Sequence, residues 1–185
     1  YKYISIEQGT KNRWSLVNSP NAFYFYDLLN NTIQICSGGE IAKISDLKGI
    51  HTFLINNTNK QSLILNNPSL LNGVTSSYDF INNEVFFTFL QYDKQPFTIN
   101  YNETSKSFVS LYDYTPTRYI SRGDNFLAVD NADNRSIYKQ YAGEYNKFFG
   151  IYYPSYVILN VNPESDKDCV FDNINFKSEV YLDNV

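Results

Sequence analysis

Apolar and polar side chains alternate along most of this chain with a period of two residues, and this alternation constrains the fold more than any other feature. Val85, Phe87 and Phe89 fall on one face of an extended strand. Glu84 and Thr88 fall on the other face. The chain is also rich in tyrosine (17) and phenylalanine (14), which favour strands. The sequence therefore predicts an all-β fold. Room for short helical turns remains in residues 40–54 and 143–149.

Polar turns divide the alternating segments into four successive hairpins. Asparagine, aspartate, serine and glycine dominate these turns because they tolerate the backbone conformations that reversing strands require. The predicted hairpins join residues 23–28 to 32–36, 76–80 to 84–90, 97–101 to 108–112, and 118–121 to 126–129. Later strands are predicted at residues 137–141, 156–161 and 173–181.

Hairpin units that recur at short intervals predict a β-propeller or part of one, and a β-sandwich is the alternative. A propeller blade takes ~40–45 residues, so a chain of 185 residues supplies about four blades, the lower limit of a closed ring. No linker rich in proline, glycine and serine interrupts the sequence, and we therefore expect residues 1–185 to form a single β-rich unit. The lack of methionine predicts a portion of a longer polypeptide or a processed product.

Charge and hydropathy argue against several other classes of protein. The net charge is −4 and the sequence has no run of lysine or arginine, so a phosphate-binding surface is not indicated. No stretch approaches the ~20 uninterrupted apolar residues of a membrane-spanning helix, so we expect no membrane span. The two cysteines, Cys36 and Cys169, form neither a CxxC motif nor a disulfide framework.

The sequence offers no convincing catalytic constellation. His51 is the only histidine, which argues against a metal site built on several histidines, and no nucleophile signature surrounds it. Residues 130–134 lack the spacing of a calcium loop, and the Arg-Gly-Asp tripeptide at 122–124 is interpreted as a tight turn. Five carboxylates beside the predicted turns are interpreted as surface turn residues rather than a glycoside-hydrolysing pair: Asp27, Asp79, Glu84, Asp93 and Glu103. We therefore predict a protein that is not an enzyme and has no catalytic, metal-binding or cofactor-binding residues and no cofactor.

Aromatic side chains crowd residues 138–156. Exposed tyrosines stack on sugar rings, which would make a carbohydrate-binding surface, but tyrosine also fills sheet faces and subunit interfaces. We favour packing or an interface, because the chain has a single tryptophan, Trp14. The candidate interface residues are Tyr138, Tyr141, Tyr145, Phe148, Tyr152 and Tyr153.

Four stretches together carry a resemblance to one family: residues 25–50, 78–89, 98–116 and 148–176. The most specific string is FVSLYDYTP at residues 108–116, and the likeness extends over residues 23–181. In this order the stretches resemble the tail stabilisation protein of crAss-like podoviruses, also called the nozzle or muzzle protein. Family members are several times longer, so the resemblance also implies that this chain is a portion of a muzzle protein.

The resemblance implies a structural virion protein that carries a β-propeller and has no catalytic residues to transfer. Copies would form a ring around the tail channel, through which genome and cargo proteins are ejected. The implied partners are other copies of the chain, the remainder of the muzzle polypeptide, and the portal, ring and tail hub proteins, with DNA only in transit. The implied location is the phage tail of a virion assembled in the host cytoplasm. The alternative is a carbohydrate-binding or glycoside-processing propeller of a gut bacterium with an AT-rich genome.

Overall fold

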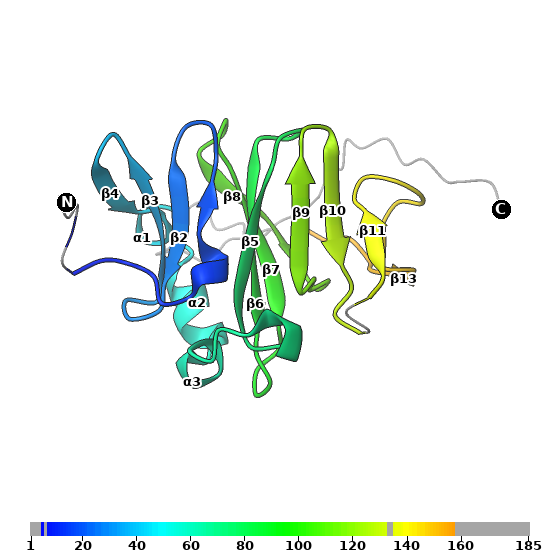
Figure 1. The fold of residues 1–185 in the computed structure, drawn as a ribbon, viewed down its shortest axis with the longest axis horizontal. Helices are drawn as coiled ribbons and strands as arrows, with labels where there is room; N and C mark the ends of the chain where they lie inside the picture. The colour runs from blue at the N-terminus through cyan, green and yellow to red at the C-terminus, as the bar shows by residue number, and fades with distance from the viewer. Residues whose placement is uncertain (1–4, 6, 133–134, 158–185) are drawn as a thin grey trace, which may run out of the picture. The chain divides into compact units, whose positions relative to one another are not determined.

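Antiparallel strands dominate the described part of the chain, which confirms the all-β prediction at this level (Figure 1). The computed structural model describes residues 5, 7–132 and 135–157. The chain divides into two compact units, Tyr1–Pro154 and Ser155–Val185, and all the elements below lie in the first. None of the helices in the described ranges is long and apolar enough to cross a membrane.

Strands that follow one another in the chain pair side by side, so each sheet is a meander. The first sheet contains β1 (Val17–Asn18), β2 (Phe23–Asp27), β3 (Thr32–Ser37) and β4 (Glu40–Lys43). The second sheet contains β5 (Gly73–Asp79), β6 (Glu84–Leu90), β7 (Phe97–Asn102) and β8 (Ser107–Tyr112). The third sheet contains β9 (Arg118–Arg122), β10 (Asn125–Val129) and β11 (Ile137–Lys139), and a pair follows, β12 (Lys147–Phe148) and β13 (Ile151–Tyr152). All four predicted hairpins are therefore confirmed.

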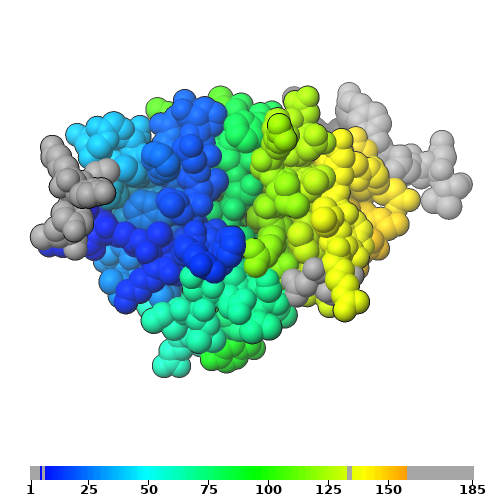
Figure 2. Space-filling view, in the orientation of Figure 1, coloured from blue at the N-terminus to red at the C-terminus, as the bar shows by residue number. Residues whose placement is uncertain are grey.

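Short helices connect the first and second sheets. They are α1 (Ile44–Leu47), α2 (His51–Asn57) and α3 (Lys60–Leu63), followed by the 3-10 turn η2 (Pro68–Leu70). Another 3-10 turn, η1 (Arg13–Ser15), precedes β1. The short helical turn predicted within residues 40–54 is confirmed by α1 and the start of α2, whereas the first four residues of that range pair with β3 as β4. The helices continue to Leu63 because the Asn59 side chain caps α3 by accepting a hydrogen bond from the backbone N–H of Gln61. Figures 1 and 2 show α2 and α3 gathered at one end of the sheets.

Several of the elements predicted after residue 136 differ from those in the structure. Residues 143–149 form turns and β12 instead of a helix, because Asn146 and Phe149 adopt left-handed φ angles of 58° and 53° that end any right-handed helical run. The predicted strand 137–141 stops at Lys139. Tyr156 and Val157 lie in no strand, and the remaining residues of the strands predicted at 156–161 and 173–181 lie outside the described residues.

Three of the hairpins turn in the same way. The first turn residue is an aspartate or asparagine whose Oδ1 accepts hydrogen bonds from backbone N–H groups two or three positions later. Four positions on, the backbone takes a left-handed φ of 53–56° and the second strand begins. The three pairs of residues are Asp27 with Asn31, Asp79 with Asn83, and Asn102 with Lys106.

The second sheet is buried on both faces. Val85, Phe87 and Phe89 are each 0% exposed and pack against the first sheet, which confirms the predicted register of β6. The Tyr26 ring meets Phe89 edge-on with ring centres 5.0 Å apart. On the opposite face Phe86 lies 5.1 Å from the ring of Phe126, which stands on β10 of the third sheet. The three sheets therefore stack in chain order.

The first strand of the second sheet contacts the first strands of the other two sheets. β5 touches both β1 and β9, and η1 packs on β5 as well. Figure 1 shows β9 running beside β5. Each sheet consequently begins at a shared edge and adds its later strands away from that edge.

Candidate interaction site

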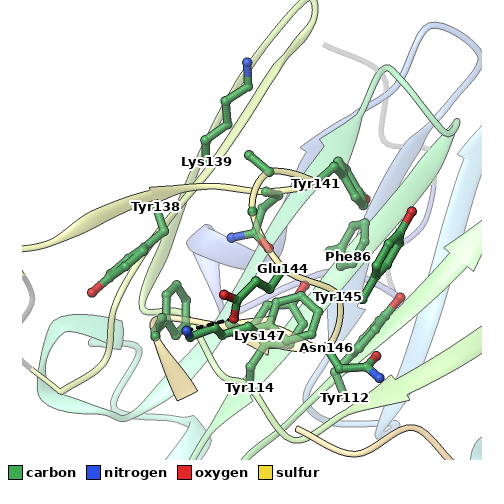
Figure 3. Close-up of a pocket in the computed structure, with 16 residues that line it drawn as sticks. Phe86, Tyr112, Tyr114, Tyr138, Lys139, Tyr141, Glu144, Tyr145, Asn146 and Lys147 are labelled. Atoms are coloured by element: carbon green, nitrogen blue, oxygen red, sulfur yellow. Dashed lines mark hydrogen bonds and ion pairs between the residues drawn. The ribbon is translucent and has the colours of Figure 1, made fainter. Parts of the chain in front are cut away.

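An aromatic pocket of about 670 Å³ lies between the second sheet and the segment 138–150 (Figure 3). Phe86 on β6, Tyr112 at the end of β8 and Tyr114 just beyond it contribute one part of the lining. A pocket of this size with aromatic walls is of the kind that holds a ligand or a partner side chain. Four of the six predicted interface residues line it: Tyr138, Tyr141, Tyr145 and Phe148.

Half of the predicted interface residues contribute to the protein's own packing. Phe148 stacks on Tyr114 with ring centres 4.2 Å apart and planes 4° from parallel. Tyr138 packs edge-on against Phe149, and Tyr153 meets Phe148 in the same way. These side chains belong to a second apolar cluster between the second and third sheets. Their place in this cluster explains much of the crowding of aromatics in the sequence.

The other half remain largely open to solvent. Tyr145 is 90% exposed and Tyr152 is 67% exposed. Tyr141 is 58% exposed, but its hydroxyl donates a 2.8 Å hydrogen bond to Asp79 and its ring stacks on Phe126. Partial burial, followed by the hydrogen bond to Asp79, raises the pKa of Tyr141 and keeps it neutral as a donor. Of the six residues, Tyr145 and Tyr152 are therefore the ones most available to a partner.

The pocket rim carries polar groups of both signs. Lys147 Nζ lies 2.9 Å from the carboxylate of Glu144, and both side chains are exposed. Lys139 points away from the other labelled side chains (Figure 3). Among the described residues that line the pocket, Glu144 is the only carboxylate, so these residues do not supply the carboxylate pair that glycoside hydrolysis uses. The lining residues could instead bind a partner through the faces of the aromatic rings and through the charges of Glu144 and Lys147 at the rim.

The turn carboxylates are not simple surface residues, and the prediction for them is wrong in part. Asp79 is 0% and Asp27 1% exposed. Asp27 accepts hydrogen bonds from the side-chain amides of Asn30 and Gln34. Sequence reasoning missed this burial because the hydrogen bonds of these aspartates within their own turns are typical of surface turns. The neighbouring sheet that covers them is not apparent from the local sequence.

Glu103 holds the first and second sheets together. Its carboxylate accepts hydrogen bonds from Tyr24 (2.8 Å) and Ser19 (2.6 Å) of the first sheet and its β1–β2 turn. It also accepts from Asn21 at 2.9 Å and from Tyr78 on β5 at 3.1 Å. Partial burial raises the pKa of Glu103, but these four donors outweigh it and the net pKa is lowered. The matching tyrosine pKa values are raised, that of Tyr78 to about 12.

The remaining candidate residues have structural surroundings. His51 opens α2 and its Nδ1 lies 3.2 Å from Asp46. Gly123 takes a φ of 54° in the β9–β10 turn, as the turn interpretation of residues 122–124 predicts. Cys36 is half-buried and unpaired, whereas Cys169 lies outside the described residues. Within the described ranges, no three His, Cys, Asp or Glu side chains are grouped so that they would hold a metal ion.

Comparison with known proteins identifies the family. The sequence profile described as crassvirus muzzle protein matches residues 1–132, and the profile described as crassvirus muzzle protein C-terminal domain matches residues 143–184. A relative named muzzle protein, from Bacteroides phage crAss001, is 29% identical over 181 residues. That alignment covers 96% of this chain and 12% of the relative. The chain therefore belongs to the crassvirus muzzle protein family.

Proposed function

We propose that this chain is a structural component of the tail muzzle of a crAss-like phage, the nozzle through which genome and cargo proteins leave the virion. The observation that carries the proposal is the match of two muzzle profiles over residues 1–132 and 143–184. The chain spans only 12% of the length of its phage relative, so it supplies one portion of such a muzzle. Its proposed partners are the remainder of a muzzle polypeptide, further copies in a ring, and the portal, ring and tail hub proteins.

Within this portion, the three stacked sheets represent successive blades of a β-propeller. In a propeller each blade is an antiparallel meander whose first strand lies nearest the central axis. The contacts of β5 with β1 and β9 support this arrangement, and so does the burial of both faces of the second sheet. A sandwich of two sheets would leave each sheet with one covered face, and Phe86 and Phe87 argue against it because both are buried.

The aromatic pocket and its exposed tyrosines form the proposed contact with a neighbouring subunit. Tyrosine is enriched in the buried cores of protein interfaces. Tyr145 lines the pocket and exposes most of its ring, and so does Tyr152 of β13, which pairs with the pocket-lining residue Lys147 of β12. The proposed role is structural and non-enzymatic, and the match to a muzzle protein family supports it.

Purified virions of the phage that encodes this sequence provide the direct test. Mass spectrometry should detect peptides from residues 1–157, and a cryo-electron microscopy map should accommodate the stacked sheets at the tail end distal to the capsid. Peptides found only in infected cells, or a map whose muzzle lacks these sheets, would overturn the assignment. Strong binding of the isolated chain to a polysaccharide, together with absence from virions, would instead support the carbohydrate-binding alternative.

The subunit contact has its own test. Tyr145→Ala combined with Tyr152→Ala should lower the fraction of assembled muzzle measured by light scattering, because two exposed rings are removed. Tyr92→Ala is the matched control, since Tyr92 is 66% exposed and does not line the pocket. Equal assembly of the double variant and the control would place the interface elsewhere.

A further inference from the structure

Two arginines share one indole at the edge where the first strands meet. The guanidinium carbon of Arg13 lies 4.8 Å from the centre of the Trp14 ring, and that of Arg118 lies 4.5 Å from the same centre. Arg13 and Trp14 belong to η1, which packs on β5, whereas Arg118 opens β9. The fold thus joins two cations that stand 105 positions apart in the sequence.

Among the described residues, this pair of cations has no carboxylate partner. Neither Arg13 nor Arg118 forms an ion pair with any described residue, although the chain as a whole carries an excess of acidic groups. Both guanidinium carbons lie so near one ring centre that their separation is below the Debye length of about 10 Å at 0.1 M salt. Their repulsion is therefore poorly screened, and an anion bound next to both of them would relieve it.

The side chains are also oriented in advance. Arginine stacks on an aromatic ring through the flat face of its guanidinium, which leaves the in-plane N–H donors free for an anion. Arg118 is held further by a 2.9 Å hydrogen bond that it donates to Ser69 Oγ. Arg13 is exposed, and Trp14 and Arg118 are half-buried, so the group is open to a ligand.

We propose that Arg13, Trp14 and Arg118 form a binding site for a phosphate-type oxyanion. Two guanidinium forks offer more donors than the two oxygens of a carboxylate use well, and a tetrahedral oxyanion matches them better. The oxyanion is either free phosphate or a phosphodiester of a nucleic acid strand, because stacked arginine and aromatic groups also serve single-stranded nucleic acids. The inference does not depend on the proposed muzzle function.

Trp14 makes the site directly observable, since it is the only tryptophan of the chain. We expect a saturable change of its fluorescence on titration with sodium phosphate and none with sodium chloride at equal ionic strength. A short oligothymidylate forms the second arm of the experiment. Binding much tighter than that of phosphate, with a steep salt dependence, identifies nucleic acid as the source, and equal binding per phosphate group identifies the free anion.

Variants locate the binding. Arg13→Ala and Arg118→Ala should each weaken the binding about tenfold or more, because each removes one charged set of donors. Arg118→Lys keeps the charge without the fork and should weaken it less. Lys48→Ala is the control, since it removes one exposed positive charge from the end of α1. No saturable change with either ligand, or unchanged binding in a folded Arg13→Ala variant, would overturn the proposal.

Discussion

Truncation of Phe86 tests whether the second and third sheets pack as described. The side chain is 1% exposed and its ring centre lies 5.1 Å from Phe126, 6.1 Å from Tyr112 and 6.2 Å from Tyr119. Phe86→Ala therefore removes a fully buried ring together with three aromatic contacts. Changes of this kind cost about 3–5 kcal/mol of unfolding free energy. Aromatic contacts of this geometry place the expected value in the upper half of that range.

Urea titration followed by circular dichroism measures the free energy directly, and the slope should stay unchanged if only stability is altered. In thermal melting, the same loss corresponds to a fall of roughly 6–20 °C for a chain of this size. Phe23→Ala is the control, because Phe23 is 51% exposed. If Phe86→Ala is as mild as Phe23→Ala, the two sheets do not stack in solution and the blade arrangement is wrong.

Three further predictions concern the sheet seams and one turn. The four hydrogen-bond donors lower the pKa of Glu103, so its contribution to stability is present above the ordinary value near 4.5 and disappears as the pH falls through the lowered value. The melting temperature of the Glu103→Gln variant should therefore fall less steeply with decreasing pH than that of the unchanged protein. Burial and the hydrogen bond to Glu103 raise the pKa of Tyr78 from 10.0 to about 12. The contribution of Tyr78 to stability is therefore complete below pH 10 and is lost as the pH rises through 12, which tyrosinate absorbance and circular dichroism measure together. Gly73→Ala should cost at least about 1 kcal/mol in chemical unfolding, because Gly73 has a φ of +121° and an added Cβ would lie 3.1 Å from the Asn66 Cα; a neutral effect would mean that this backbone relaxes freely.

Sequence alternation predicts one face of a strand well and says little about the other. Val85, Phe87 and Phe89 were placed correctly because three apolar residues at every second position need a common cover. Thr88 lies on the opposite face of the strand, and this polar residue is also 0% exposed. Its hydroxyl lies 2.8 Å from that of Thr98 and 2.6 Å from that of Tyr119, so it is buried with its polar atom satisfied. Only the third sheet, distant in sequence, reveals this environment.

The aromatic stretch shows the same limit for the candidate site. Composition alone marks residues 138–156 as a place where rings gather, and a pocket does form there. Composition cannot show which of these rings are packed and which are exposed, because the packing depends on residues from other parts of the chain. Tyr114, for example, stacks on Phe148. A repeated sequence string, by contrast, marks two of the hairpin turns. The string Tyr-Asp-x-x-Asn-Asn occurs at residues 26–31 and 78–83, and in both copies the tyrosine hydroxyl lies within hydrogen-bonding distance of the side-chain oxygen of the last asparagine.

Both seams between sheets use the same chemical device. Glu103 accepts a hydrogen bond from Tyr24 of the first sheet, and Asp79 accepts one from Tyr141, which follows the third; each bond is 2.8 Å long. Apolar faces alone would tolerate sliding of one sheet over the next, since the hydrophobic effect has no direction. A phenol that must reach one carboxylate fixes the register, because a misplaced sheet would take a donor away from a buried or half-buried charge. The tyrosines of this chain thus order the stack as well as fill it.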